Sequence, residues 1–384
     1  MRRKLWVTLS AGAATVAVAA ALGGSAGAST KLTTVTLQLK WVTQAQFAGY
    51  YAAADQGYYK DAGLDVKIKV GGPNITPETV VAGGGADLGL DWLPNLFATD
   101  EKGGNLVSVA QVFARSGMTE ITWKSSGIDS IAKMKNKTVG VWCCGNQPEL
   151  YAALNKNGID PNNPKDVTIF NQPFDMTAFL GKQIDAAAAM TYNELAQVLE
   201  TKNPATGQLY QLSDLNVFKM SDIGTGMLED NIFTTSKWLT SKTNQATLVK
   251  FLAASFKGWI YCRDHAAACV DIVLKNGPTL GKGHQTWQMN EINKLIWPNQ
   301  TGIGTVPLSA VNQTATIART YGVVKKKPSP GTTNYTYARK ALATPWNVIR
   351  REGRPVASPQ GACRENIRRP RTRSPSCVAS SRCS

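Results

Sequence analysis

The stretch of residues 38–68 constrains the fold of this chain more than any other. It reads as a strand ending in Trp41, a loop rich in glutamine and aromatic residues, a helix and a second strand. Small side chains on that helix, such as Ala48 and Ala52, let it pack closely on a sheet. Such a unit builds a parallel α/β layer, and ligands bind beyond the carboxyl ends of its strands. That edge carries rings and amides but no evident nucleophile or base, which predicts recognition rather than catalysis.

Strand periodicity dominates the chain up to Phe233, and helical periodicity dominates after it. This order predicts an α/β protein whose helical C-terminal part returns to complete the first half. Strands are expected at residues 34–41, 65–70, 86–91, 106–113, 138–143, 166–171, 185–190 and 217–223. Helices are expected at residues 46–55, 77–82, 93–102, 130–134, 147–157, 176–182, 192–202, 244–262, 266–275, 284–296 and 308–321.

Two extended segments, residues 121–124 and 231–234, bound a β/α block of about a hundred residues, which is an ordinary domain size. We therefore expect one lobe inserted into another, with a hinge that lets the two close around a ligand. Lobe 1 would comprise residues 29–121 and a helical return at 233–349, and lobe 2 would comprise residues 122–232. The alternative is a single continuous doubly wound sheet.

The first residues have the pattern of an export signal. Three positive charges at residues 2–4 precede an apolar run at residues 5–22, and Ala26, Gly27 and Ala28 supply a small-residue cleavage site. We expect residues 1–28 to be a signal peptide, with an uncleaved anchor as the alternative. No cysteine precedes Cys143, so a lipid anchor at a signal-peptide cysteine is excluded. The mature protein is therefore expected to be periplasmic or extracellular.

The charge of this chain is concentrated near its end. The formal net charge is +16, which by itself would suggest a nucleic-acid or membrane surface. Nine arginines and two glutamates lie in residues 350–384, whereas the body has no basic block. We expect that tail to be disordered, as a frame-shifted or unselected extension or, alternatively, a segment binding an acidic partner. Nucleic-acid binding by the body is not supported.

Several segments together resemble type II periplasmic solute-binding proteins. The branch is the one shared by binders of thiamine-pyrimidine precursors, riboflavin, sulfonates and nitrate, and by the eukaryotic thiamine pyrimidine synthase. The segments, in chain order, are KWVTQAQFAGYYAAADQGYYKDAGLDV, VVAGGGADLGLDW, ARSGM, GVWCCGNQPE, IDAAAAMTYNE and EDNIFTTSKWL. The resemblance implies a two-lobed fold and a monomeric binding component of an ABC importer. Its partners would be a small ligand and a membrane permease, and it would need no cofactor.

The resemblance also raises an enzyme as an alternative, because the synthase belongs to the same branch. The synthase carries a reactive lysine and histidine just after its D-x-G element, where this chain reads DWLPN at residues 91–95. Its cysteine-rich run is not matched at residues 223–230, and the histidines His265 and His284 fall in the helical C-terminal part. No serine or cysteine nucleophile has a neighbouring histidine in a recognisable hydrolase motif. We therefore expect a binding protein.

The candidate ligand-binding residues stand mostly at strand ends, and each also has a structural interpretation. Trp41 could belong to the core, and Glu194 could be a first-turn carboxylate favoured by the helix dipole. Arg115 fits an inter-lobe salt bridge as well as a ligand clamp. Cys143 stands in a loop with no second Cys/His pair at metal-ligand spacing, which favours a structural cysteine. The full set is Trp41, Gln44, Gln46, Phe47, Tyr50, Asn74, Asp91, Trp92, Arg115, Trp142, Cys143, Asn146, Asp175, Tyr192, Asn193 and Glu194.

Cys262 and Cys269 form a candidate disulfide. Seven residues of continuous helix would separate them by about 10 Å, whereas a disulfide needs Cα atoms within about 7 Å. We therefore expect the helix to break near Asp264 and His265, with the two cysteines bridged.

The ligand is expected to be a planar nitrogen heterocycle. Six aromatic residues among the candidates exceed what nitrate or a small sulfonate needs, and rings stack on π-systems. The glutamine, asparagine and glutamate side chains suit ring nitrogens, carbonyls and amines. A thiamine pyrimidine precursor or a riboflavin-like ring fits both features. A sulfonate or nitrate ligand is the further alternative.

Overall fold

The computed structural model describes residues 31–143 and 145–344. The predicted signal peptide, Cys144 and the arginine-rich tail lie outside the described residues. No helix within these two ranges combines the length and the apolar character needed to cross a membrane.

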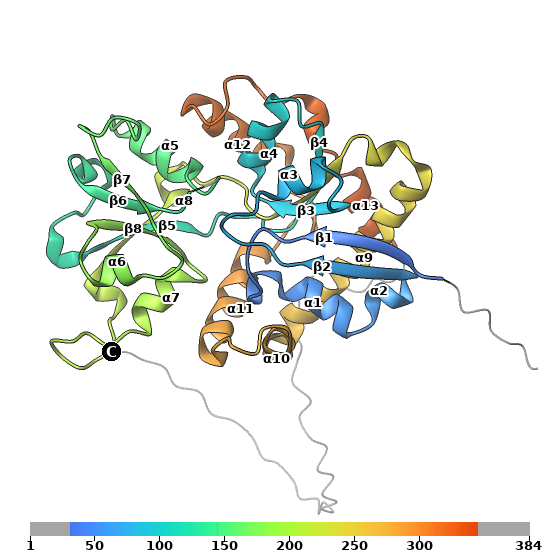
Figure 1. Ribbon diagram of the computed structural model, residues 1–384, viewed down its shortest axis with the longest axis horizontal. Helices are drawn as coiled ribbons and strands as arrows, with labels where there is room; N and C mark the ends of the chain where they lie inside the picture. Colours follow the sequence, from blue (N-terminus) through green and yellow to red (C-terminus); the bar gives the residue numbers. More distant parts are fainter. Residues whose placement is uncertain (1–30, 144, 345–384) are drawn as a thin grey trace, which may run out of the picture. The chain divides into compact units, whose positions relative to one another are not determined.

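The first sheet has the strand order β2-β1-β3-β10-β4 (Figure 1). β1 pairs in parallel with β2 and β3, whereas β10 runs antiparallel to β3 and β4. The parallel pairs place the carboxyl ends of β1 and β3 at one edge, as the sequence predicted. The strands are β1 (Thr33–Gln38), β2 (Leu64–Lys69), β3 (Leu88–Asp91), β4 (Leu106–Gln111) and β10 (Asn231–Thr235).

The second sheet has the order β7-β6-β8-β5-β9. β6 pairs in parallel with β7 and β8, and β5 runs antiparallel to β8 and β9. Its strands are β5 (Met118–Trp123), β6 (Thr138–Val141), β7 (Thr168–Asn171), β8 (Ala186–Met190) and β9 (Leu215–Lys219). Because β10 returns to the first sheet, the second lobe is inserted into the first.

The first crossing lies slightly before the expected segment at residues 121–124, and the second begins where the segment at residues 231–234 was expected. The chain leaves the first sheet after Gln111 and joins the second at Met118, and it returns to the first at Asn231. The exact limits of the two lobes stay a prediction. One expected strand was partly wrong: β9 ends at Lys219, because residues 220–223 form the short helix α8, which ends at the left-handed Gly224 (φ 81°).

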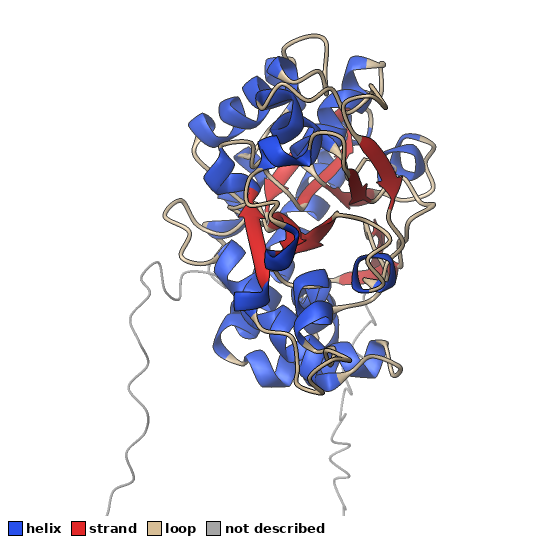
Figure 2. Ribbon diagram, turned by 90° about the vertical axis from the view of Figure 1, so that its left-hand side faces the viewer, coloured by secondary structure: helices blue, strands red, loops and turns tan. Residues whose placement is uncertain are grey.

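Helices flank the strands (Figure 2). In the first part of lobe 1 they are α1 (Ala48–Asp55), α2 (Tyr58–Asp61), α3 (Pro77–Ala82) and α4 (Leu93–Glu101). Those of lobe 2 are α5 (Pro148–Lys156), α6 (Thr177–Leu180), α7 (Glu194–Leu199) and α8 (Met220–Ile223). The helical return contains α9 (Lys242–Asp264), α10 (Ala266–Asn276), α11 (Lys282–Ile296), α12 (Leu308–Thr320) and α13 (Thr336–Leu342).

The return packs on the first lobe through a close contact between α1 and α9. A Cβ on Gly49 would lie 2.2 Å from a ring atom of Trp259, and one on Gly258 would lie 2.0 Å from the Gly49 carbonyl oxygen. Only glycine at both positions allows this approach. The contact turns one face of α1 into the core, which decides how the residues just before it are oriented.

The disulfide prediction is confirmed. The Cα atoms of Cys262 and Cys269 lie 5.3 Å apart and the two residues are bridged. α9 ends at Asp264 and α10 begins at Ala266, with His265 between them at φ −135° and ψ 53°. This non-helical residue folds the chain back, which brings the two cysteines within bonding reach.

Candidate functional site

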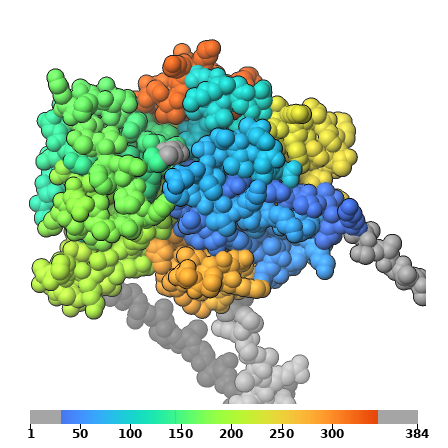
Figure 3. Space-filling view, viewed as in Figure 1, coloured from blue at the N-terminus to red at the C-terminus, as the bar shows by residue number. Residues whose placement is uncertain are grey.

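A narrow cavity of about 30 Å³ is lined by residues of both lobes. This volume is far below the range usual for small-molecule pockets. In the space-filling view, the segments of lobe 2 (green) and lobe 1 (blue) abut one another (Figure 3). The lining residues are Lys40, Trp41, Gln44, Gln46, Trp92, Trp142, Asn146, Met190, Tyr192, Asn193 and Glu194.

The lining comes almost entirely from the segments that follow four strands. β1 leads to residues 40–46, β3 to Trp92, β6 to residues 142–146, and β8 to residues 190–194. Nine of the sixteen candidates therefore lie together around one cavity, as expected for the carboxyl ends of parallel strands. Their part in binding a ligand stays a prediction.

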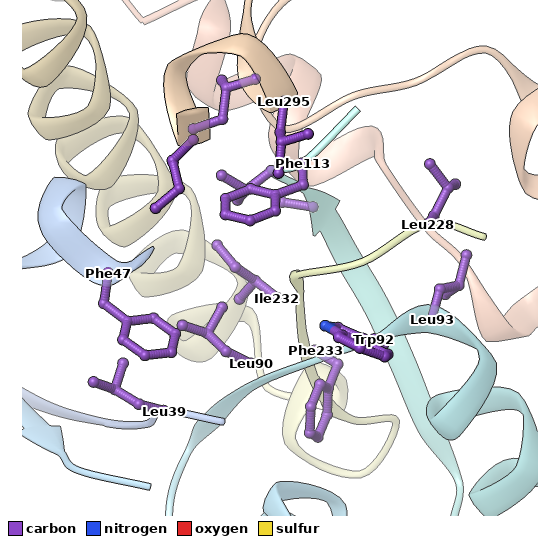
Figure 4. Packing of buried hydrophobic residues seen from close by; sticks show 14 of the residues in the cluster. Leu39, Phe47, Leu90, Trp92, Leu93, Phe113, Leu228, Ile232, Phe233 and Leu295 are labelled. Atoms are coloured by element: carbon purple, nitrogen blue, oxygen red, sulfur yellow. The ribbon is translucent and has the colours of Figure 1, made fainter. Parts of the chain in front are cut away.

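Phe47 and Tyr50 do not reach the cavity. Phe47 is fully buried and lies beside Leu39 and Leu90 (Figure 4). Tyr50 packs edge to face on Trp259, with ring centroids 5.6 Å apart. Tyr50 belongs to the core because α1 presents this face to α9, whereas Phe47 belongs to it because the turn just before α1 packs on the strands of the first sheet (Figure 4).

Asp91 and Arg115 have structural partners. Asp91 forms a buried ion pair with Lys40, and its Oδ1 also accepts a hydrogen bond from the Asn95 amide at 3.0 Å. The Arg115 guanidinium donates to main-chain carbonyl oxygens after and at the end of α11, the shortest being that of Pro298 at 2.7 Å. The arginine therefore forms no salt bridge among the described residues, and it lies outside the cavity lining.

Three further candidates lie in loops outside the cavity lining. Asn74 is exposed, and the exposed Asp175 accepts a local hydrogen bond from the Thr177 amide at 2.9 Å. The Cys143 amide donates to Asn171 Oδ1 at 3.1 Å. In the Asp175 loop it is the neighbouring residue, Phe174, that reaches lobe 1, where its ring contacts Trp41.

The sequence reasoning missed Lys40 and Met190. Lys40 lies 4.8 Å above the centre of the Trp92 ring and is ion-paired with Asp91, with side-chain exposures of 7% and 3%. The signal was present: Lys40 follows β1 and Asp91 ends β3, and these strands are neighbours. A lysine and an aspartate at adjacent strand ends can neutralise each other, so neither needs to bind a charged ligand.

Amide and carboxyl groups form a connected series along the cavity. Gln46 Nε2 donates to both carboxylate oxygens of Asp230, at 3.0 and 3.2 Å, and Gln44 Nε2 donates to Gln46 Oε1 at 2.7 Å. In lobe 2, Asn193 Nδ2 donates to Glu194 Oε1 at 2.6 Å. All five side chains are buried.

Burial shifts the acidity of the two carboxyl groups that end this series. It raises the pKa of Glu194 to about 7, against the opposing effect of hydrogen bonds from the Met190 amide and Asn193. Burial likewise raises the pKa of Asp230 to about 6, opposed mainly by the hydrogen bond from Gln46. Near neutral pH, Glu194 can therefore accept from an amine or, when protonated, donate to a ring nitrogen.

Residues 31–143 and 145–344 contain no group of three or more histidine, cysteine or acidic side chains placed to hold a metal ion. The cavity offers stacking surfaces, amides, one carboxyl group and the ammonium group of Lys40, which is paired with Asp91.

Comparison with known proteins places the chain in a family. Residues 44–268 match the model described as NMT1/THI5 like. The chain is 24% identical over 248 residues to the formylaminopyrimidine-binding protein of Halalkalibacterium halodurans, which covers 64% of this chain and 71% of that protein. It is 25% identical over 166 residues to a Haemophilus influenzae protein named for thiamine biosynthesis, spanning 43% of this chain and about half (52%) of that protein.

A solved structure shares the architecture. The periplasmic nitrate-binding protein NrtA from Synechocystis PCC 6803 superposes with a TM-score of 0.60 at 14% identity, covering 82% of this chain and 89% of that one. This likeness shows the fold. Because the family match spans more than half of the chain, the protein belongs to the NMT1/THI5-like family and has the two-lobed, type II periplasmic-binding-protein fold.

Proposed function

We propose that this protein is the extracytoplasmic solute-binding component of an ABC importer and that it captures a planar nitrogen heterocycle between its two lobes. The observation that carries the proposal is the lining of the cavity: Trp41, Trp92, Trp142 and Tyr192 supply rings from both lobes, and the amide series lies beside them. Rings that stack on a flat ligand add about 0.5–1.5 kcal/mol per pair beyond area burial.

The charges of the lining argue against nitrate or a sulfonate. Lys40 is the basic residue of the lining, and its charge is already balanced by Asp91. Glu194 adds a carboxyl group to the same cavity. An anion would therefore meet an occupied ammonium and a carboxylate, whereas an amine or a ring N–H finds an acceptor.

One relative favours a single ring over a flavin, because its printed name is that of a formylaminopyrimidine-binding protein. A pyrimidine precursor of thiamine is the ligand we propose, with riboflavin as the second candidate.

Mass spectrometry first identifies any small molecule that the purified protein releases on denaturation. Isothermal calorimetry then measures the binding of a formylated aminopyrimidine, thiamine, riboflavin, nitrate and taurine. We expect tight binding of the pyrimidine and loss of affinity in Trp41→Ala. Tight binding of taurine or nitrate without heterocycle binding overturns the ligand class. Unchanged affinity in Trp41→Ala removes the stacking role.

The enzyme alternative is tested separately. Purified protein supplied with iron and pyridoxal phosphate is expected to form no pyrimidine product, because the lysine, histidine and cysteine run of the synthase are not matched in this sequence. Intact-mass analysis after incubation provides the readout: a histidine converted to a fragment of lower mass would establish the synthase reaction.

A further inference from the structure

Helix α11 carries two buried glutamines three residues apart, and they have different partners. Gln285 and Gln288 are 1% and 0% exposed. Gln285 Oε1 accepts a hydrogen bond from the Ala45 main-chain amide at 2.7 Å. Gln288 Nε2 lies 3.0 Å from Gln44 Oε1 and 3.0 Å from Asn193 Oδ1. Gln288 therefore joins a lobe 1 residue of the cavity to a lobe 2 residue of the cavity.

In lobe 1, the Asp230 carboxylate fixes which way the amide groups of Gln46 and Gln44 face. An ionised carboxylate only accepts hydrogen bonds, so Gln46 must present its Nε2 to Asp230. Its Oε1 then faces Gln44, which must present its own Nε2. The remaining polar atom of Gln44, its Oε1, faces Gln288.

The lobe 2 amide is fixed in the same way from the other end. Glu194 accepts from the Met190 main-chain amide at 3.0 Å and from Asn193 Nδ2 at 2.6 Å. Asn193 therefore presents Oδ1 to α11, where His284 Nε2 also lies at 2.8 Å. Gln44 Oε1 from lobe 1 and Asn193 Oδ1 from lobe 2 therefore both face the Gln288 side chain.

An amide nitrogen with two protons satisfies this arrangement, and the reversed amide does not. Reversal would place Gln288 Oε1 against both oxygens, where three acceptors would have no proton among them. In the observed orientation Gln288 Oε1 has no hydrogen-bond partner among the described residues, and leaving a buried oxygen unpaired costs about 1–3 kcal/mol. The two bonds from Nε2 offset that cost.

We propose that Gln288 is a positioning residue for ligand specificity: by bonding both Gln44 and Asn193, it holds the Gln44 amide, as a donor to the ligand, at a fixed separation from the Glu194 carboxyl group, as an acceptor. The inference rests on the proposed function and names its ligand class more closely. A ring with an exocyclic amine beside a ring nitrogen complements a donor and an acceptor, whereas the corresponding oxo ring carries the reverse pattern.

The test replaces each glutamine of α11 by methionine, which keeps the length of the side chain. Gln285→Met is the matched control, because it removes a buried amide from the same helix whose partner is the Ala45 main-chain amide rather than a side chain of the series. Calorimetry gives the affinity for a 4-aminopyrimidine relative to its 4-oxo analogue. We expect Gln288→Met to lose about tenfold of this selectivity, the equivalent of one hydrogen bond, while Gln285→Met keeps it.

A second readout needs no ligand. Carboxyl-carbon NMR follows the titration of Glu194. We expect its midpoint to rise in Gln288→Met, because Asn193 Oδ1 keeps His284 but loses Gln288, which weakens the hydrogen bond from Asn193 to Glu194. The midpoint should stay unchanged in Gln285→Met. If the methionine variant fails to fold, Gln288→Glu replaces it. The carboxyl group of that variant has at most one proton, so it can donate to only one of the two oxygens. We expect the variant to lose selectivity as well.

The outcomes separate the two proposals. If the wild-type protein binds neither pyrimidine, the proposed ligand class fails, and the Glu194 midpoint alone decides the role of Gln288. Equal effects of the two methionine variants on the midpoint, or wild-type selectivity in Gln288→Met, overturn the positioning role.

Discussion

The indole of Trp41 meets the phenyl ring of Phe174 edge to face, with ring centroids 5.0 Å apart and an interplanar angle of 73°. Trp41 follows β1 in lobe 1 and lines the cavity, whereas Phe174 follows β7 in lobe 2 and remains 44% exposed. The contact thus joins the lobes through a ring that also borders the ligand space. Aromatic pairs of this kind contribute about 0.5–1.5 kcal/mol beyond area burial.

Removing Phe174 should speed ligand release. We expect Phe174→Ala to raise the dissociation rate about two- to tenfold, because the closed arrangement loses one aromatic contact between the lobes. Trp41→Ala should weaken binding further, since it removes the same contact and a wall of the cavity. Stopped-flow dissociation measures both. Leu212→Ala, at a side chain 54% exposed and outside the cavity lining, is the control. A dissociation rate in Phe174→Ala equal to that of the control would contradict the expectation.

A buried pair of glutamates shares one hydroxyl group near the crossing between the sheets. Ser116 Oγ lies 2.7 Å from Glu149 Oε2 and 3.0 Å from Glu229 Oε1. One hydroxyl proton serves only one of these contacts, so the other needs a proton on a carboxyl group. Burial raises the pKa of Glu149 to about 8. Burial and the charges of Glu149 and Asp230 raise the pKa of Glu229 well above its ordinary value.

The pair should make stability depend on pH. A carboxyl whose pKa is raised on folding contributes stability that is present below its unfolded pKa of about 4.3 and is lost as pH rises through the folded pKa. For Glu149 that loss extends to about pH 8. We expect the melting temperature to fall between pH 5 and pH 8, and Glu149→Gln to reduce the fall by about 5 °C.

Calorimetric melting curves across this range provide the measurement. Asp230 and Tyr192 face the same pair and remain in the variant. Asp271→Asn, at a side chain 61% exposed, is the matched surface control and should keep the wild-type slope. A Glu149→Gln profile parallel to the wild type would show that the pair carries no proton on folding.

Loss of the bridge between Cys262 and Cys269 should destabilise the helical return without changing the cavity. Both cysteines are fully buried, and closing a loop this short stabilises by about 2 kcal/mol in the chain-entropy account. We expect the double alanine variant to melt about 5 °C lower and to keep its ligand affinity. Peptide mapping without reduction checks the bridge itself. Recovery of Cys262 as an alkylated free thiol from oxidised protein would refute it.

The sequence by itself determined where the cavity residues stand along the chain. Trp41, Trp92, Trp142 and Tyr192 each follow a strand whose pattern is visible locally, and parallel strands bring such ends to one edge. The bridge between Cys262 and Cys269 was also predicted from the sequence. Seven residues of unbroken helix would hold the two cysteines too far apart, so a bridge required the helix to end between them. Local periodicity and covalent geometry carry this information.

Only the tertiary structure decided which neighbouring side chains face the ligand space. Phe47 lies in the core and Phe174, rather than Asp175, crosses to Trp41, because the rotation of a helix or loop depends on what packs against it. Gln288 reaches Gln44 from 244 residues further along the chain. No local pattern marks such a contact: it exists because α11 packs beside the segment after β1, and a buried amide takes its partner from whichever surface closes over it.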